Sequence, residues 1–260
     1  MPPTPRVVIT GASSGIGAAL ARHYARQGAV LGLIARRVSA LESLSASLST
    51  RCALYAVDIR DEGALRAAAG DFASRYGCPD IVIANAGVSS GTLTEYPEDF
   101  AVFQEAFEVN VLGLARSFQP FLACMRERGR GALAGIASVA GYRGLPGGGA
   151  YCASKAAAIA YLESLRLELR GSGISVTTIS PGFVATPMTE TNPYRMPFLI
   201  SAEDAAGRIA ALIERRASSA VIPWQMALVA GVLRVMPNWL YDRLFAGAPR
   251  KPRRLPITRP

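Results

Sequence analysis

The chain has 260 residues, half of them apolar and 18% charged, which suits one large α/β domain with its own core and excludes a disordered chain. The formal net charge is +9, but from Trp224 onward seven basic residues accompany a single acidic one, so the excess belongs mainly to the C-terminal end. We therefore expect no nucleic-acid partner, since that function needs a basic face with base-reading or stacking elements.

The N-terminus and the cysteines bear on the cellular compartment. Residues 1–10 lack the apolar core and the small-residue cleavage site of a secretion signal, so we expect a cytoplasmic protein. The chain has one histidine and no C-x-x-C pair, and its four cysteines are Cys52, Cys78, Cys124 and Cys152. This wide spacing argues against a zinc site and against a disulfide framework. We expect no bound metal and four buried, reduced thiols.

Short strand-like runs alternate with longer helical patterns along the chain. The strand-like runs are 6–10, 30–35, 52–57, 80–84, 132–138, 174–180 and 220–222. The helical patterns are 15–27, 39–49, 62–76, 97–127, 150–170 and 202–216. Several strand runs are continuously apolar, as expected for strands covered on both faces. We predict one doubly wound, Rossmann-like α/β domain over residues 1–223, with a seven-stranded parallel sheet and helices on both of its faces.

A glycine-rich turn from Thr10 to Gly17 lies between the first strand and the first helix, with the spacing G-x-x-x-G-x-G. Glycines at this place permit a tight turn and let backbone N–H groups approach a pyrophosphate at the positive end of the helix dipole. The candidate cofactor-binding residues of the turn are Gly11, Ser13, Ser14, Gly15, Ile16 and Gly17.

Two arginines, Arg36 and Arg37, follow the second strand. An acidic residue at this place holds the ribose 2′-hydroxyl of NAD, whereas arginine accommodates the 2′-phosphate of NADP. The pair therefore favours NADP(H) over NAD(H), and a solvated surface pair is the alternative. After the third strand, Asp58 and Ile59 are candidates for an adenine contact, and for Asp58 an N-cap of the next helix stays open.

Tyr151 and Lys155 are four residues apart on a predicted helix and so share one face. The chain has only two lysines, which gives this spacing weight. A tyrosine hydroxyl has a pKa of about 10, and a nearby ammonium with an oxidised nicotinamide would lower that pKa. Ser138, at the C-terminal end of a strand, can hydrogen-bond a substrate oxygen. Taken singly, the Tyr/Lys spacing recurs by chance and such a serine is usually a cap or a turn residue.

Taken in order, these motifs resemble those of the short-chain dehydrogenase/reductase family over about residues 6–222. The resemblance implies an active-site tetrad, whose members are Asn110, Ser138, Tyr151 and Lys155. It further implies that Asn110 bends its helix and holds a water that links the lysine to bulk solvent. The cofactor contacts that it implies beyond the turn are Asn85, Ala86, Gly87, Tyr151, Lys155, Pro181, Gly182, Val184 and Thr186.

The same resemblance implies an oxidoreductase that transfers a hydride between NADP(H) and a small-molecule carbonyl/alcohol pair, with Tyr151 as proton donor. Ketone reduction is the expected direction. An NADP-dependent alcohol dehydrogenase that works oxidatively is one alternative, and a non-catalytic dinucleotide-binding sensor is another. Members of the family often assemble, so we expect a homodimer or a homotetramer.

In that family, substrate specificity lies in the segment after Pro181 and Gly182, here about residues 187–200, and its methionines and aromatic residues suggest an apolar lid. The substrate is accordingly expected to be an apolar, lipid-like ketone. The candidate substrate contacts are Ser138, Tyr142, Leu145, Tyr151, Phe183 and Met188.

Residues 224–260 lie beyond the resemblance and form a predicted helical extension with a basic tail. Apolar residues recur at helical spacing over 224–245, with a break at Pro237, and the run is too short to span a bilayer. Trp224, Trp239 and the basic run 250–254 would suit peripheral contact with an anionic membrane surface. Packing over the substrate pocket and covering a subunit interface are the alternatives.

Overall fold

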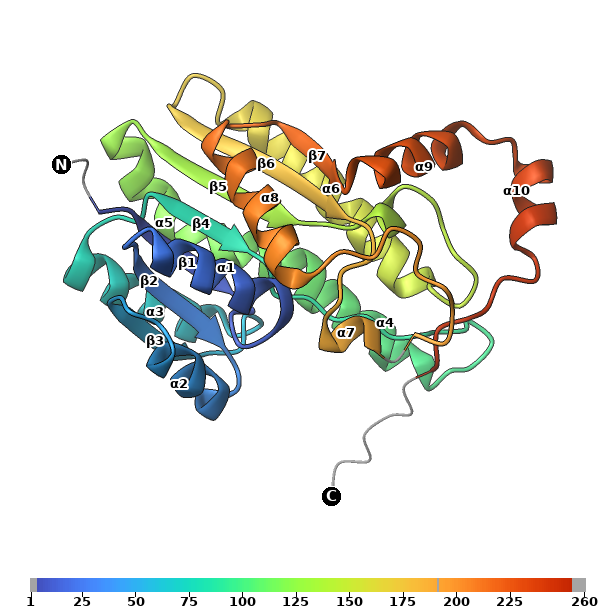
Figure 1. Cartoon of the computed structure of the whole chain (residues 1–260), viewed down its shortest axis with the longest axis horizontal. Coiled ribbons are helices and arrows are strands. Elements are labelled where there is room, and N and C mark those ends of the chain that lie inside the picture. The colour runs from blue at the N-terminus through green and yellow to red at the C-terminus, as the bar shows by residue number, and fades with distance from the viewer. Residues whose placement is uncertain (1–3, 191, 254–260) are drawn as a thin grey trace.

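A computed structural model describes residues 4–190 and 192–253, and its strands form one parallel sheet with helices on both faces (Figure 1). The strand order is β3-β2-β1-β4-β5-β6-β7. The strands are β1 (Arg6–Thr10), β2 (Val30–Ala35), β3 (Cys52–Ala56), β4 (Ile81–Ala84), β5 (Gly131–Ile136), β6 (Ile174–Pro181) and β7 (Ser219–Ile222). The predicted doubly wound fold is confirmed, and the strand ends agree with the sequence pattern to within two residues.

Two sets of helices bury the two faces of the sheet. Residues of α1, α2 and α8 form one core with the sheet, and residues of α3, α5 and α6 form the other. Because side chains alternate along a strand, Val7 and Ile9 belong to the first core and Val8 to the second. The helices are α1 (Gly15–Arg26), α2 (Val38–Ala46), α3 (Glu62–Tyr76), α4 (Asp99–Phe107), α5 (Leu114–Arg128), α6 (Gly149–Glu168), α7 (Pro187–Glu190), α8 (Ala202–Glu214), α9 (Trp224–Val235) and α10 (Asn238–Phe245).

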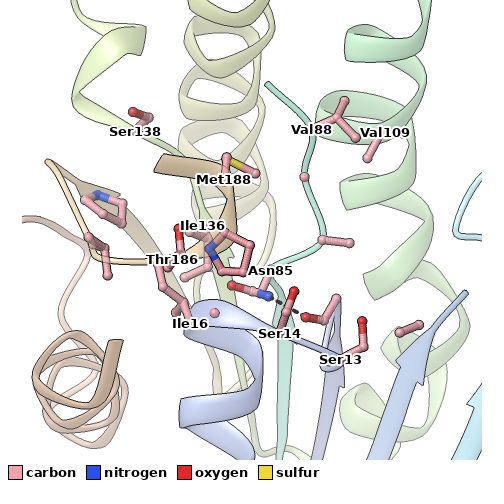
Figure 2. A pocket seen from close by; sticks show the side chains of 18 of the residues that line it. Ser13, Ser14, Ile16, Asn85, Val88, Val109, Ile136, Ser138, Thr186 and Met188 are labelled. Atoms are coloured by element: carbon pink, nitrogen blue, oxygen red, sulfur yellow. Dashed lines mark hydrogen bonds between the residues drawn. The ribbon is translucent and has the colours of Figure 1, made fainter. Parts of the chain in front are cut away.

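The strand order reverses between β1 and β4, and this reversal positions the site. The connections of these two strands leave on opposite sides, so a crevice opens at their carboxyl ends. Figure 2 shows the turn after β1, with Ser13 and Ser14, facing Asn85 at the end of β4. Ligands bind at this place in open α/β sheets.

The predicted helix over 97–127 is broken in two, because a π-helical turn at Glu108–Gly113 separates α4 from α5. Asn110 lies in this turn and is fully buried. Its side-chain amide accepts a hydrogen bond from the backbone N–H of Val88 (2.9 Å) and donates one to the Val88 carbonyl (3.0 Å). Such turns interrupt regular helices and are frequent at functional sites. The helix is interrupted at Asn110, the residue at which the resemblance implied a bend.

The C-terminal extension forms α9 and α10, with the predicted break at Pro237. It packs on the loop between Ser138 and Tyr151. There, Arg143 donates to the carbonyls of Leu233 (3.2 Å) and Met236 (3.0 Å), and the Tyr241 hydroxyl donates to the Gly144 carbonyl. No helix within the described part of the chain is long and apolar enough to cross a membrane.

The prediction of four reduced thiols is wrong for one pair, since a disulfide joins Cys78 to Cys124. Cys78 precedes β4 and Cys124 lies on α5, 46 residues later. The fold brings their Cα atoms to 5.9 Å, well within the range for a disulfide, and the sequence spacing does not reveal this proximity. Cys52 and Cys152 are free thiols.

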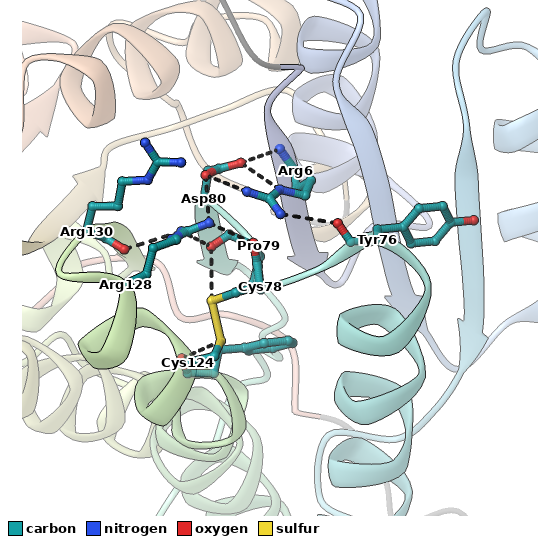
Figure 3. A network of polar contacts seen from close by, with 9 residues as sticks. Arg6, Tyr76, Cys78, Pro79, Asp80, Cys124, Arg128 and Arg130 are labelled. Atoms are coloured by element: carbon teal, nitrogen blue, oxygen red, sulfur yellow. Dashed lines mark hydrogen bonds and ion pairs between the residues drawn. A yellow bond between two sulfur atoms is a disulfide. The ribbon is translucent and has the colours of Figure 1, made fainter.

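Asp80, beside this disulfide and just before β4, connects the start of β1 with the end of α5 (Figure 3). Its carboxylate accepts from the backbone N–H (2.9 Å) and the Nε (3.1 Å) of Arg6 and pairs with Arg128 (3.0 Å). Arg128 also donates to the carbonyls of Cys78 (2.9 Å) and Pro79 (2.7 Å). Burial opposes ionisation of Asp80, but the hydrogen bonds from Arg6 and the positive charges of Arg6 and Arg128 together outweigh it, so the pKa of this carboxyl lies below its usual value.

We expect Asp80→Asn to lower the free energy of unfolding at neutral pH by about 1–3 kcal/mol, because it leaves two part-buried arginines without their counter-charge. The folded-state pKa is depressed, so the carboxylate stabilises the protein above its unfolded pKa of about 3.9, and the effect is lost as the pH falls through the folded value. Equilibrium urea unfolding from pH 7 to pH 3 measures it. Glu62→Gln, which removes an exposed pair with Arg66, is the control and should change stability far less. Equal losses for both variants would contradict the assigned role.

Candidate active site

A cavity of about 340 Å³ lies at the carboxyl ends of the central strands, a size typical of small-molecule sites. Its lining includes every predicted cofactor residue except Gly17, together with Ser138, Tyr151, Lys155 and Met188. Apart from Gly17 and Asn110, the residues that the sequence assigned to cofactor and chemistry therefore share one pocket, although they are spread over more than 170 positions of the chain (Figure 2).

The glycine turn is held open by contacts with the end of β4. The Asn85 side chain donates to the carbonyls of Thr10 (3.1 Å) and Gly11 (3.2 Å), and the Thr10 hydroxyl accepts from the backbone N–H of Asn85 (3.2 Å) and Ala86 (3.3 Å). Gly11 has a φ of +67°, which favours glycine. The Ser14 side chain makes no cap bond to the first turn of α1, so the N–H groups of that turn are available to an anionic ligand.

Gly17 lies behind the turn and not in the pocket wall. A Cβ at this position would sit 2.2 Å from the Gly11 carbonyl oxygen and 2.6 Å from the Asn85 amide nitrogen. Gly17 therefore lets α1 approach the turn, and its contribution to a cofactor site is indirect. A side chain at Gly11 or Gly17 would collide with the backbone around the turn. The two glycines therefore keep the turn in the shape that fits a dinucleotide pyrophosphate.

The other end of the pocket is basic. Arg36 and Arg37 are exposed, and Arg37 donates to the Ser13 hydroxyl (3.3 Å) in the glycine turn.

Asp58 accepts from the backbone and the guanidinium of Arg60, and the side-chain hydrogen bond from Arg60 lowers the pKa of this carboxyl. The alternative that Asp58 caps the next helix is wrong: Asp61 caps α3, through a bond from the Ala64 N–H (2.9 Å).

The four tetrad residues come from three segments of the chain that meet beside the cavity. The Lys155 ammonium donates to the Ile136 carbonyl (2.8 Å) at the end of β5 and lies 5.9 Å from the centroid of the Tyr151 ring. The Asn110 amide donates to the Ser154 hydroxyl (2.9 Å), which donates to the Tyr151 carbonyl (2.8 Å). Asn110 thus positions the first turns of α6, which carry the tyrosine and the lysine.

Burial controls the electrostatics of this centre. It raises the pKa of the Tyr151 hydroxyl, and a hydrogen bond with Ser138 acts in the opposite direction. It also lowers the pKa of Lys155 to about 8. The sequence predicted that Lys155 lowers the pKa of Tyr151. In the structure the ammonium donates to a backbone carbonyl, and Lys155 is not among the groups that lower the tyrosine pKa. Desolvation disfavours both charged forms.

The substrate side is only partly defined by the cavity. Met188 lines it, whereas Tyr142, Leu145 and Phe183 are not among its lining residues and stay predictions. Phe183 faces Tyr194, with ring centroids 6.3 Å apart.

Sequence reasoning missed several residues that hold the site together. Ser154 links Asn110 to α6, and Ile136 accepts the bond from Lys155. No periodicity marks either residue. Ser154 lies beside Lys155 in the Tyr-x-x-x-Lys motif. Thr10, a third missed residue, comes directly before the first glycine of the turn. Their places next to a motif were the only signal that the sequence offered.

A doubly wound sheet with a dinucleotide cradle and a buried Ser/Tyr/Lys centre defines an NAD(P)-dependent oxidoreductase. Comparison with known proteins agrees. The family model described as short chain dehydrogenase matches residues 5–196. An uncharacterized oxidoreductase of Myxococcus xanthus (strain DK1622) is 38% identical over 240 residues, covering 90% of this chain and 94% of the relative. The chain belongs to the short-chain dehydrogenase family.

Two solved structures show the same fold with different cofactors. L-sorbose reductase from Gluconobacter frateurii, complexed with NADPH and L-sorbose, is 28% identical with a TM-score of 0.75, and the match covers 84% of this chain and 95% of that one. A 3-ketoacyl-(acyl-carrier-protein) reductase from Brucella melitensis, complexed with NADH, is 26% identical with a TM-score of 0.77 and coverages of 84% and 96%. The fold therefore accommodates both nicotinamide dinucleotides.

We expect Gly17→Ala to weaken binding of the dinucleotide by roughly thirtyfold, or about 2 kcal/mol, because the new Cβ collides with the Gly11 carbonyl and must displace the turn. Quenching or enhancement of NAD(P)H fluorescence on titration measures the affinity. Gly207→Ala in α8 is the matched control, since a Cβ there meets nothing within 4 Å. An unchanged affinity in Gly17→Ala would show that α1 and the turn can separate without loss of the cradle.

Proposed function

We propose that the protein is an NADPH-dependent carbonyl reductase that acts on an apolar ketone and, in reverse, on the corresponding secondary alcohol. The observation that carries the proposal is the meeting of Ser138, Tyr151 and Lys155 at one end of a pocket whose other end carries Arg36 and Arg37. The oxidative direction remains the alternative, since the same residues serve both directions.

The chain's own residues supply the proton chemistry. When bound, the nicotinamide ring donates or accepts the hydride. Ser138 and Tyr151 hydrogen-bond the substrate carbonyl oxygen, and the Tyr151 hydroxyl gives its proton to that oxygen as the carbon is reduced. Because burial raises the tyrosine pKa, the hydroxyl holds its proton at neutral pH, which is the form that reduction needs. Lys155 contributes positive charge beside the ring and is available to a ribose hydroxyl.

Three features support the preference for NADPH. No acidic residue follows β2, where Ala35 is succeeded directly by two arginines. Both guanidinium groups line the pocket. Arg37 is tied to Ser13 of the glycine turn, so the basic end and the pyrophosphate cradle form one surface. Guanidinium matches phosphate oxygens well and is weakly hydrated.

The remaining parts of the proposal have unequal support. Met188 and Val88 in the pocket wall favour an apolar substrate. Homo-oligomer formation and a cytoplasmic location stay predictions from the sequence. Peripheral membrane contact is supported by the exposed Trp224 and Trp239, 64% and 70% accessible, but Lys251 and Arg253 of the basic tail bind the protein itself. Arg254 lies outside the described residues.

We expect Tyr151→Phe to reduce turnover by about 10²–10⁴-fold while dinucleotide binding survives, because the variant loses the phenolic hydroxyl and keeps the ring and the rest of the cofactor contacts. NADPH oxidation with ketones graded by chain length and ring size measures it in the wild type and the variant. Tyr161→Phe, on the same helix but outside the pocket lining, should retain activity. Full activity in Tyr151→Phe would refute the mechanism, and a preference for small polar ketones would refute the apolar substrate.

We expect the double variant Arg36→Ala/Arg37→Ala to lose roughly 10- to 100-fold in kcat/KM with NADPH and little with NADH, because two charge-assisted contacts to the 2′-phosphate disappear. Steady-state kinetics with both cofactors checks this. Arg26→Ala, an exposed arginine at the end of α1, is the control for loss of positive charge. A parallel loss with both cofactors would indicate a solvated surface pair without a phosphate role.

A further inference from the structure

The C-terminal tail returns from α10 to the substrate side of the pocket. In Figure 1 the red segment after α10 turns back toward α4 and α7. The Gly91 N–H donates to the Pro252 carbonyl (3.0 Å), and Gly91 pairs with Arg253 in a parallel bridge. A Cβ at Gly91 would lie 2.1 Å from the Lys251 carbonyl oxygen, so only glycine permits so close an approach. The tail therefore lies against the loop that follows β4.

Arg253 fixes the tail in this position. Its guanidinium donates to both carboxylate oxygens of Asp99 (2.8 and 3.1 Å) and to Glu98 (2.9 Å), and it lies 3.6 Å from the centroid of the Tyr96 ring. Asp99 is only 3% exposed and also accepts from the Leu93 N–H (2.8 Å). A bidentate pair of this kind has a defined geometry. It therefore fixes the position of the residues just before Arg253, including Lys251.

The ammonium of Lys251, two residues earlier, lies between the loop after β4 and α7. The ammonium donates to the Ser89 hydroxyl (2.9 Å) and to the Met188 carbonyl (3.5 Å). Met188 lines the cavity, and so does Val88, the neighbour of Ser89. Lys251 and Ser89 are not lining residues themselves, but both lie next to lining residues, on the side of α7 and the loop after β4. The substrate segment predicted from the sequence begins there.

This ammonium has no counter-charge in the described part of the chain. Its two acceptors are neutral oxygens, and no carboxylate in residues 4–190 or 192–253 lies within ion-pair distance. Partial burial lowers its pKa, and no acidic neighbour acts against that effect. Arg253 differs from Lys251 in this respect, because the arginine binds both nearby carboxylates, those of Glu98 and Asp99. A partly desolvated cation with a free donor favours an anion.

We propose that Lys251 binds an anionic oxygen group of the substrate, a carboxylate or a phosphate, so that the substrate is a ketone with an apolar body and an anionic end. The inference rests on the proposed function and narrows its substrate class. The carbonyl meets Ser138 and Tyr151, the apolar body lies along Met188 and Val88, and the anionic group reaches the lysine ammonium. Lys251 is a specificity residue and takes no part in hydride or proton transfer.

Ligand binding without turnover tests the proposal. Octanoate, octyl phosphate and the uncharged octanamide are titrated calorimetrically into the full-length protein with saturating NADP⁺. We expect at least one of the two anions to bind about tenfold or more tightly than octanamide, and the tighter of the two identifies the anionic group. Equal affinities of all three ligands in the wild-type protein would overturn the proposal without the need for any variant.

A pair of variants assigns the effect to Lys251. Lys251→Met keeps the apolar stem and should abolish the preference for the anion, whereas Lys251→Arg should retain most of it. Arg250→Met, which removes an exposed cation next to it, should leave the preference intact. A preference that survives in Lys251→Met, or that is lost equally in Arg250→Met, would contradict the assignment.

Turnover separates this inference from the function on which it rests. NADPH oxidation is followed with matched pairs of oxo acids and their methyl esters. If neither member of any pair is reduced, the proposed reductase activity fails, while the calorimetric comparison still decides the role of Lys251. If esters are reduced as efficiently as acids, the reductase activity stands and the anion site is refuted.

Discussion

The side-chain amide of Asn110 holds the active centre together. It is fully buried, and its three hydrogen bonds join the π-helical turn before α5, the loop after β4 and the start of α6. A buried amide left without partners would cost several kcal/mol, or about 1–3 kcal/mol for each lost bond. The regular helix is therefore interrupted at the one place that lets this amide reach Val88. The positions of Tyr151 and Lys155 follow, because Ser154, which Asn110 contacts, lies between them on α6.

The same burial that makes this network rigid also sets the chemistry. The raised pKa of Tyr151 and the lowered pKa of Lys155 have one main cause, since burial disfavours both the phenolate and the ammonium. The Tyr151 phenolate and the Lys155 ammonium therefore form more easily when a bound ligand brings a charge of the opposite sign into the pocket. We therefore expect ionisation of Tyr151 to depend on the charge of the group that occupies the pocket, a dependence that a tyrosine on the surface would lack.

Much of the fold was predictable because its signals are local. Continuously apolar runs marked buried parallel strands, and the glycine turn, Arg36–Arg37 and the Tyr-x-x-x-Lys spacing lay at the places where the observed strands and helices begin or end. The misses are contacts between distant parts of the chain. The bond from Cys78 to Cys124 spans 46 residues, and the pairing of Asp99 with Arg253 spans 154. Periodicity reports which face of an element is buried, but not which distant element covers it.

Local and distant contacts also shape different parts of the candidate site. The family match covers residues 5–196 and includes the predicted cradle and tetrad, so we expect that part of the chain to encode the reaction. Residues beyond it also contact the loops next to the pocket: Tyr241 bonds Gly144, and Lys251 bonds Ser89. Because Arg143 in turn anchors α9 and α10, the extension and the loop before α6 position each other. We therefore expect substitutions in residues 224–253 to change substrate choice while leaving the proposed hydride and proton chemistry the same.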